Sequence, residues 1–289
     1  MERSRSGLIA PRAAMGRVRS AQLPWDDPDP VGHLAQVLGD GLAFVALFVS
    51  PQADFGAVMA GASRFGDAVV VGCTTAGEIG AQGYAEGSIM AIALSRHDFV
   101  AAPILISDLG QLDGPALVRD TVRTRTALVA QEPDWSQEFA FLLVDGLSVR
   151  EDALVSTLAA GLGPVPLFGG SAGDGNRFQE TFVALGDRVY RNAAVLCMIR
   201  TACEVQVFSL DHLRPSEQRM VVTEADPARR IVRQINAEPA AREYARMLGK
   251  DPEQLSAFTF AAHPVVVRFG GAHHVRAIQR MLDNGNLVF

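Results

Sequence analysis

Long apolar runs alternate with segments of helical periodicity over the first two thirds of the chain. Apolar residues in continuous runs are typical of strands that are buried on both faces of a sheet. Such runs predict strands at residues 43–50, 68–73, 88–94, 99–107, 138–144, 165–168, 181–185, 193–199 and 204–210. Apolar residues at helical spacing predict helices at residues 28–40, 54–65, 115–130 and 149–162. The order of these elements predicts an α/β fold with mixed sheets.

Two short segments of this pattern are nearly the same. Residues 69–80 read VVVGCTTAGEIG and residues 166–177 read PLFGGSAGDGNR, and Thr75 and Ser171, 96 residues apart, hold equivalent places in them. When the sequence is shifted by the same 96 residues, the apolar run at 43–50 aligns with residues 139–146. We therefore expect an internally duplicated α/β region, with repeats at about 26–110 and 111–211, whose two turns face one another across a shared cleft.

The pattern changes after residue 211. Shorter, partly alternating segments predict strands at residues 219–223, 230–235 and 258–268 and a helix at 239–248, and residues 275–281 form a final apolar stretch. We expect a smaller α+β domain at residues 212–289, which looks incomplete because the chain ends on Leu287, Val288 and Phe289 within a strand-like segment. Residues 1–25, rich in Arg, are expected to be a disordered tail.

Composition and charge narrow the classes of function. The net charge of −6 and the pI of about 5.5 argue against a broad basic surface for nucleic acid. No apolar run reaches the ~18 residues of a membrane span, and the N-terminus lacks the apolar core of a signal peptide. Three cysteines without close spacing indicate neither a disulfide framework nor a zinc site. The expected location is the cytoplasm, with neither a nucleic-acid nor a membrane partner.

The two turns hold the candidate binding residues. Hydroxyl groups, carboxylates, a thiol, a guanidinium and open backbone amides would together suit a small polar ligand that carries an amine and an acid group. The predicted ligand-binding residues are Cys73, Thr74, Thr75, Glu78, Gly170, Ser171, Asp174 and Arg177, with Arg214 beyond the second repeat. The alternative is structural: small residues let the two repeats pack tightly, while the acids cap the following loops.

A hydrolase is the catalytic alternative, with Ser171 or Cys73 as the nucleophile. Gly169–Gly173 is formally a G-x-S-x-G sequence, but Asp174, Gly175 and Asn176 interrupt the helix that a nucleophile elbow must open. No histidine in the sequence is a specific partner for either nucleophile. The glycines also fail to match a dinucleotide-binding fingerprint.

His212 is the candidate axial ligand for a haem. Haem b needs one axial ligand and an apolar pocket, so no spacing motif would reveal it. His212 follows a predicted buried strand at the expected domain change, and His263, His273 and His274 are the next candidates. The apolar residues nearby serve equally well in an ordinary core.

The turns VGCTTAGEIG and PLFGGSAGDGNRFQETFV, followed by RPSEQRMVVTEADPARRIVRQINAEPAAREYARMLG, resemble the FIST family over about residues 30–289. The first two segments resemble its N-terminal sensory domain, and the third resembles the start of its C-terminal domain, which we expect to be incomplete here. The resemblance implies a cytoplasmic sensor rather than an enzyme, with small ligands such as amino acids. Some bacterial members resemble haem proteins that sense nitric oxide and control a histidine kinase or a cyclic-di-GMP enzyme. This chain would have to act on such a partner in trans.

Overall fold

The computed structural model describes residues 16–175, 177–208, 210 and 213–289. The chain divides into two compact units, with the boundary after Phe208, and each unit is described by itself. The expectation of an α/β fold with mixed sheets is confirmed. None of the helices in the described ranges has the length and apolar character needed to cross a bilayer.

The first sheet of unit one has six strands in the order β1-β6-β2-β3-β10-β11. Strands β2 and β3 are parallel, and the other neighbours are antiparallel. Strand β2 is apolar throughout because both of its faces are covered, as its continuous run predicts. The strands are β1 (Val18–Pro24), β2 (Leu42–Val49), β3 (Val69–Thr74), β6 (Ser88–Ser95), β10 (Val183–Leu185) and β11 (Arg188–Tyr190).

The second sheet repeats this order with four strands, β7-β12-β8-β9, of which β8 and β9 are parallel. Strand for strand it matches β1-β6-β2-β3. A short hairpin, β4–β5, leaves the first repeat at the point where β10–β11 leaves the second, but it forms a separate two-stranded sheet. These strands are β4 (Glu78–Gly80), β5 (Gly83–Ala85), β7 (Phe99–Ile106), β8 (Gln137–Val144), β9 (Leu167–Ser171) and β12 (Ala194–Thr201).

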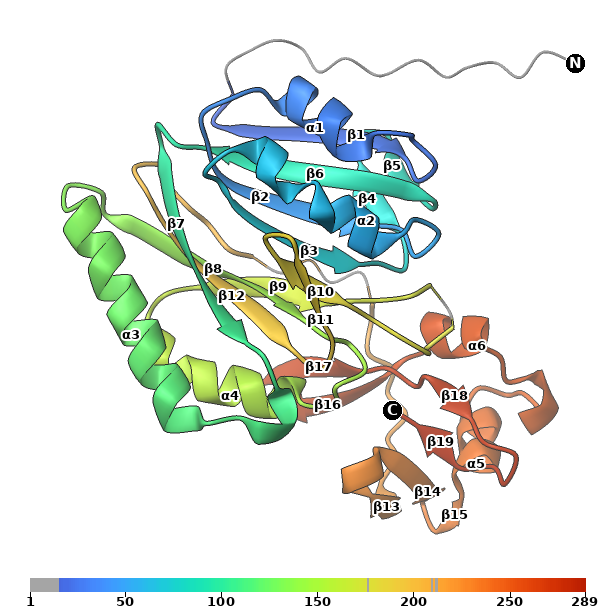
Figure 1. The fold of residues 1–289 in the computed structure, drawn as a ribbon. Coiled ribbons are helices and arrows are strands. Elements are labelled where there is room, and N and C mark those ends of the chain that lie inside the picture. Colours follow the sequence, from blue (N-terminus) through green and yellow to red (C-terminus); the bar gives the residue numbers. More distant parts are fainter. Residues whose placement is uncertain (1–15, 176, 209, 211–212) are drawn as a thin grey trace, which may run out of the picture. The chain divides into compact units, whose positions relative to one another are not determined.

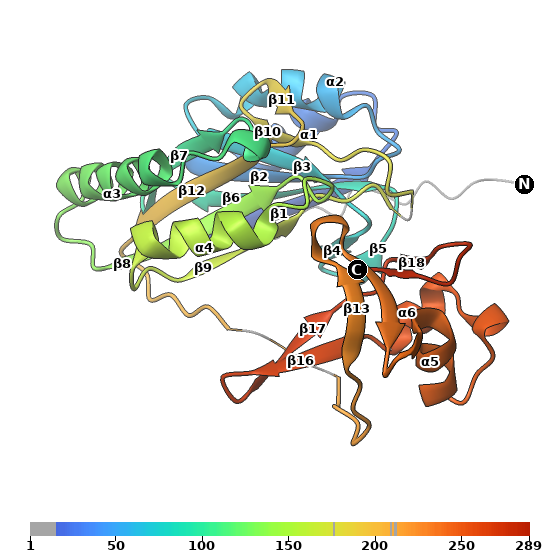
Figure 2. The ribbon, with the colours of Figure 1, turned by 90° about the horizontal axis from the view of Figure 1, so that it is seen from below.

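Unit one is a four-layer sandwich in which each sheet carries its own helices on its outer face (Figure 1). Figure 2 shows the same layers from below, with α3 and α4 against the second sheet. The inner faces of the two sheets share a core that includes Phe44, Val71, Phe141 and Cys197. The helices are α1 (Pro30–Leu38), α2 (Phe55–Ala60), α3 (Gly114–Gln131) and α4 (Glu151–Leu162), with 3-10 turns η1 (Ala62–Phe65) and η2 (Leu109–Gln111).

Aspartates begin three of these helices. The side chains of Asp29, Asp54 and Asp113 accept hydrogen bonds from backbone N–H groups in the first turns of α1, α2 and α3. Each bond satisfies a donor that the helix itself leaves unpaired. The three aspartates therefore fix where these helices begin.

The structure corrects the repeat boundaries. Strand β1 lies within the expected tail at 1–25, because Val18–Pro24 pairs with β6 along its whole length. Each repeat begins with its edge strand, β1 or β7, so residues 99–106 open the second repeat rather than close the first. The strand expected at 204–210 is wrong for the described residues: β12 already has β7 and β8 on its two sides, which leaves residues 204–208 no place in that sheet.

The offset of 96 residues between the two repeats is the average of two different offsets, one for each pair of equivalent strands. Val49 pairs with Thr74, and Val144 pairs with Ser171. Position by position, therefore, β8 follows β2 by 95 residues, whereas β9 follows β3 by 97. Thr74, not Thr75, is the structural equivalent of Ser171.

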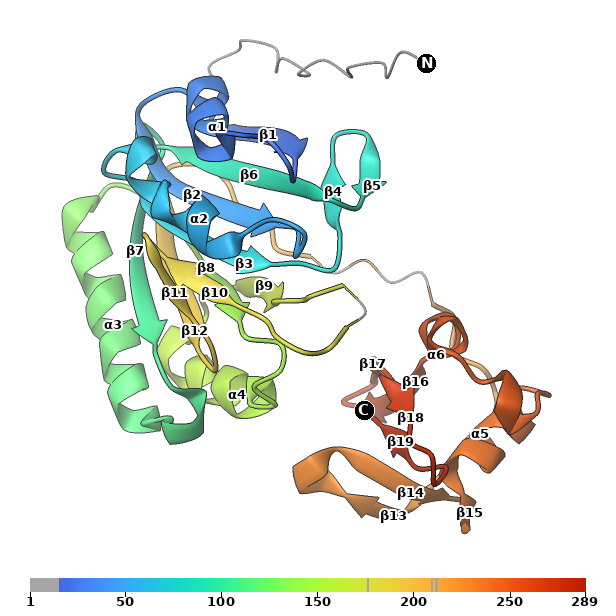
Figure 3. The ribbon, with the colours of Figure 1, turned by 45° about the vertical axis from the view of Figure 1, so that its right-hand side comes forward.

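Unit two is smaller and centres on a five-stranded sheet, β13-β14-β19-β18 with β15 beside β14, and a two-stranded hairpin, β16–β17 (Figure 3). Its core includes Ile235, Tyr244, Phe260 and Leu287. The strands are β13 (Val222–Asp226), β14 (Ile231–Ile235), β15 (Glu238–Pro239), β16 (Val265–Phe269), β17 (Ala272–Arg276), β18 (Arg280–Met281) and β19 (Leu287–Val288). The helices are α5 (Ala240–Met247) and α6 (Ala257–Ala262), with 3-10 turns η3 (Pro227–Arg229) and η4 (Pro252–Gln254).

The prediction of a strand at 258–268 is correct only for its last residues. Ser256 accepts a hydrogen bond from the backbone N–H of Thr259 and caps α6, so the first part of this apolar stretch is helical. The chain becomes a strand only from Val265 onward. A short apolar run does not by itself distinguish a buried helix from a strand.

Candidate functional site

The two repeated turns meet, as the duplication predicts, but they touch instead of facing one another across a cleft. The backbone N–H of Gly173 donates to Thr74 O at 2.9 Å, and that of Gly175 donates to Thr75 O at 3.1 Å. A Cβ atom on Gly173 would lie 3.0 Å from Ala76 N. Small residues in these turns therefore serve the close approach of the two repeats.

The first turn is closed by its own carboxylate. Glu78 is only 3% exposed and accepts hydrogen bonds from the Thr75 hydroxyl and from the Ser88 backbone N–H at 3.2 Å. The Ser88 hydroxyl donates to the same carboxylate at 2.7 Å and accepts from the Gln22 side chain at 2.8 Å. Thr74 is occupied as well, because its hydroxyl accepts from the Phe182 N–H at 3.1 Å. These groups hold the turn together and leave little for a ligand.

The second turn is organised in the same manner by Asp174, which is 3% exposed. Its carboxylate accepts from the backbone N–H groups of Phe178, Gln179 and Glu180 at 2.9, 2.7 and 3.1 Å. Burial alone would raise the pKa of this carboxyl, but the three donors outweigh burial and hold its pKa below the ordinary value. Asp174 is thus a charged anchor for the loop that leads to β10.

A third buried acid, Asp145, was missed in the sequence. It follows β8 directly, is buried, and accepts from the Thr181 hydroxyl and from the backbone N–H groups of Asn192 and Leu147. Its equivalent after β2 is Ser50. The signal available in the sequence was a single acid at the end of a fully apolar run, followed by glycine. Close by, the Ser148 hydroxyl is buried with no hydrogen-bond partner among the described residues.

Cys73 lies in the core between the sheets and does not open to solvent. Burial, followed by the nearby charge of Glu78, raises the pKa of its thiol to about 12. A thiol in such surroundings is a poor nucleophile, because the reactive form is the thiolate. Cys197 is buried in the same core, whereas Cys203 is partly exposed.

The remaining predicted residues are open to solvent. Gly170 and Ser171 lie on β9 and are exposed, and Arg177 is exposed although its Nε donates to Asp174 O at 3.1 Å. Among the hydrogen bonds of the described residues, none joins Ser171 to a histidine. Arg214 is an exposed residue of unit two. His212 lies outside the described residues.

A pocket that the sequence did not reveal lies in unit one and has a volume of about 520 Å³. Most of its lining is apolar. It is bordered by Arg17, Val18, Leu94, Phe99, Phe139, Phe168 and residues 203–208. Arg17 stands at its rim, where it donates to the Cys203 sulfur at 3.6 Å and pairs with Asp98 at 3.5 Å. Apolar concavities with few polar groups are the usual form of small-molecule sites.

A second cavity of unit one, about 590 Å³, is more polar. It lies at the opposite end of β2 and β3 from the turns, where residues 39–42 and 63–67 meet Arg96. Arg96 is already engaged with Leu42 O at 3.3 Å and with Asp67 at 3.8 Å. This second cavity therefore offers a ligand less apolar surface than the first pocket does.

The described histidines do not fit a haem site. None of them borders the apolar pocket. His33 pairs with Asp27 at 2.8 Å, the His97 side chain is 90% exposed, and His263, His273 and His274 are exposed residues of unit two. A haem ligand would therefore have to come from elsewhere, with His212 as the sequence-based candidate.

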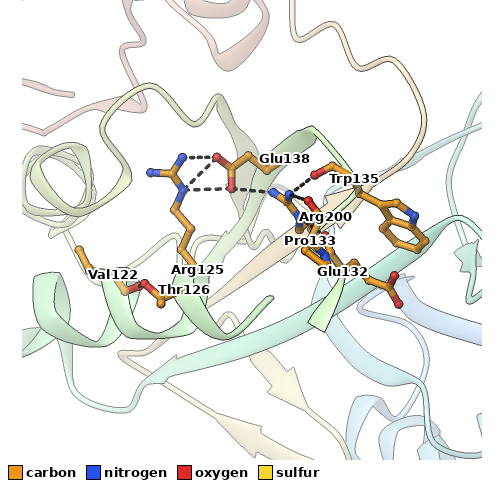
Figure 4. A network of polar contacts seen from close by, with 8 residues as sticks. All are labelled: Val122, Arg125, Thr126, Glu132, Pro133, Trp135, Glu138 and Arg200. Carbon is orange, nitrogen blue, oxygen red and sulfur yellow. Dashed lines mark hydrogen bonds and ion pairs between the residues drawn. The ribbon is translucent and has the colours of Figure 1, made fainter. Parts of the chain in front are cut away.

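A partly buried ion network lies at the end of the second sheet that is opposite the turns (Figure 4). Glu138 binds Arg125 Nε at 2.9 and 3.0 Å and lies 4.0 Å from Arg200 Nη1. Arg200 is 7% exposed, and it also donates to the carbonyl oxygens of Glu132, at 2.8 Å, and Trp135. The hydrogen bond to Glu138, partly opposed by burial, raises the pKa of Arg125. Because Arg125 lies on α3 while Glu138 and Arg200 lie on β8 and β12, the network ties α3 to the sheet.

Comparison with known proteins identifies a family. The family model described as the FIST N domain matches residues 43–238, from β2 through both turns and on into unit two. No protein of the curated set matches the chain. Because the family model covers more than half of the sequence, the chain belongs to the FIST family, whose N domain is a sensory domain of signal transduction.

Proposed function

We propose that this protein senses a small molecule that binds in the apolar pocket of unit one. The observation that carries the proposal is the contrast between that pocket and the two turns. The pocket is open and mostly apolar, whereas Glu78 and Asp174 are buried and their oxygens already accept internal hydrogen bonds. A ligand at the turns would have to displace those bonds.

The lining indicates the ligand's chemistry. Phe99, Phe139 and Phe168 offer aromatic surface, and Arg17 offers a positive charge at the rim. A compound with an apolar or aromatic body and one anionic end would use both. Free amino acids with large side chains fall in this class, while small fully polar ones do not.

The pocket also suggests how binding is passed on. Residues 203–208 form one wall, have no regular secondary structure and lead directly to the boundary between the units. A ligand packed on this wall favours those conformations of residues 203–208 that complete the pocket, which is a population shift. The signal then acts in trans on a partner such as a histidine kinase or a cyclic-di-GMP enzyme.

The test uses 1-anilinonaphthalene-8-sulfonate, a probe with an aromatic body and an anionic group. Saturable 1:1 binding is expected, and it should slow alkylation of Cys203 by iodoacetamide. Val205→Trp, which fills the pocket, should weaken binding by about tenfold or more, equivalent to ~1.4 kcal/mol. Val155→Trp is the matched control, because Val155 is exposed on α4 and outside the pocket. Equal binding by both variants would overturn the proposal.

Haem b sensing of nitric oxide is a separate version of the proposal and depends on His212. Bound haem would supply the gas-binding iron. A Soret band in protein purified after expression with haem, lost in His212→Ala, would support it. A featureless spectrum would leave the pocket to organic ligands. The hydrolase alternative has no support from the geometry, since Cys73 is buried and Ser171 has no histidine partner among the described contacts.

A further inference from the structure

Strand β9 ends the second sheet, and no strand in the described part of the chain pairs with its outer edge. The Ala140 N–H donates to Pro166 O, and the Ala172 N–H donates to Val144 O, so these even-numbered positions face β8. Backbone groups alternate along a strand. The N–H and C=O groups of Leu167, Gly169 and Ser171 therefore point away from the sheet.

The equivalent edge of the first sheet is covered. There β10 runs antiparallel to β3, with Ala184 opposite Gly72. The Gly186 N–H donates to Val70 O at 2.8 Å, and the Thr74 N–H donates to Phe182 O at 3.1 Å. Since Thr74 and Gly72 correspond to Ser171 and Gly169, the fold itself shows that this position accepts an antiparallel strand.

The edge of β9 carries none of the features that usually prevent strand addition. Its sequence, LFGGS, has no charged residue and no proline, and residues 168–171 are exposed. Natural sheets protect free edges with lysine, proline, bulges or covering segments. An edge without these features is a template to which another strand can add.

The edge is complementary to a second copy of itself. In an antiparallel pair centred on Gly169, Leu167 faces Ser171 of the partner subunit, and the outward groups of all three positions meet in hydrogen-bonded pairs. Phe168 then lies opposite Gly170 of the partner subunit. Phe168 is 44% exposed, and the Cβ position of Gly170 has open space within 4 Å. A phenylalanine ring that covers a cross-strand glycine is a known stabilising pair in sheets.

We propose that two copies of this protein pair through β9, antiparallel and about a two-fold axis, which joins their four-stranded sheets edge to edge. The geometry makes the contact isologous, so it closes at a dimer. A single short strand pair is a small interface, and the dimer is therefore reversible, with a Kd of roughly 1–100 µM. Phe168 also borders the apolar pocket of unit one, but the strand pair requires no bound ligand.

The test combines sedimentation with amide hydrogen exchange on the full chain. Wild-type protein should shift from monomer to dimer between about 1 µM and about 300 µM, and the amides of residues 167–171 should become protected over the same range. Gly170→Lys places a charge against Phe168 of the partner subunit and should keep the protein monomeric. It fits the monomer because the position is open. Val155→Lys adds the same charge on α4 and should dimerise normally.

Three results would overturn the inference. The first is wild-type protein that stays monomeric at about 300 µM. The second is a dimer that Gly170→Lys leaves unchanged. The third is protection of residues 167–171 that does not vary with concentration, which would mean that another segment already covers β9. Retained binding of the naphthalene sulfonate by Gly170→Lys would show that the monomer is folded.

Discussion

The two repeats of unit one share a strand order but are completed differently. The first sheet gains β10 and β11 from the second repeat. The hairpin of the first repeat, β4–β5, stays apart, and no strand of the described residues pairs with the outer edge of β9. Ile79 and Tyr84 of that hairpin are 74% and 64% exposed. The duplication thus produced two sheets with the same strand order. Because β10 pairs with β3, the edge of β3 is internal, whereas the edge of β9 is available.

The polar residues diverge at equivalent places. Asp145 in the second repeat corresponds to Ser50 in the first, and the pair Glu138 and Arg200 corresponds to Ala43 and Ser95. The second repeat therefore depends on buried charge where the first uses small residues. Matched substitutions at equivalent places in the two repeats test this difference. Both tryptophans, Trp25 and Trp135, lie in unit one, so their fluorescence follows its unfolding.

The largest effect is expected at Gly169. Its φ of +154° disfavours other residues, and a Cβ there would lie 1.9 Å from Leu142 O, a backbone atom of β8. Gly169→Ala should lower the free energy of unfolding by about 4 kcal/mol. At the equivalent Gly72 the nearest atom is the flexible end of Met59 at 2.7 Å, so Gly72→Ala should cost about 1 kcal/mol. Equal losses in urea titrations would refute the difference between the two edges.

Removing the buried guanidinium comes next. Arg200→Ala leaves carbonyl groups of residues 132–135 without their donor and Glu138 with one fewer cation. We expect a loss of about 3 kcal/mol. Ser95→Ala at the equivalent place is the control and should cost less than about 1 kcal/mol. Thermal unfolding followed by tryptophan fluorescence measures both, and a neutral Arg200→Ala would mean that the network in Figure 4 adds no stability.

The acid after β8 is expected to matter more than its serine counterpart. Asp145→Ala removes the acceptor of three donors and should cost about 2 kcal/mol. Ser50→Ala removes one weak contact, from the Gln52 N–H at 3.4 Å, and should cost less than about 0.5 kcal/mol. Chemical unfolding at neutral pH gives both values. A larger loss of unfolding free energy for Ser50→Ala than for Asp145→Ala would contradict the greater dependence of the second repeat on buried charge.

The smallest effect is a pH dependence at Asp174. Because its folded-state pKa is below the unfolded value of about 3.9, the carboxylate stabilises the fold above that pH, and the contribution is lost as the pH falls through the folded pKa. Asp174→Asn should cost about 1 kcal/mol at neutral pH. The gap between wild type and variant should narrow in urea titrations from about pH 7 down to about pH 3. A gap that widened toward acid would contradict this sign.

Much of this fold was predictable. The buried strands β2, β3, β8 and β12 and the capped helices follow from local patterns, because each continuous apolar run must be covered on two faces. The functional predictions went less far. The turns were located, but Glu78 and Asp174 are internal anchors, which was the structural alternative for these acids. Their donors, Ser88 and residues 178–180, lie only a few residues further along the chain, and the sequence alone did not decide between a ligand and these neighbours.

The sequence by itself determined the duplication, the α/β class and the family, since these depend on the order of apolar and small residues. The tertiary structure decided which strands became neighbours: β7 rather than residues 204–208 beside β12, β10 beside β3, and no strand of the described residues on the outer edge of β9. The physical reason is that backbone hydrogen bonds are the same for any strand. Side-chain pattern sets which faces are buried, and only the assembled sheets determine whose backbone fills each edge.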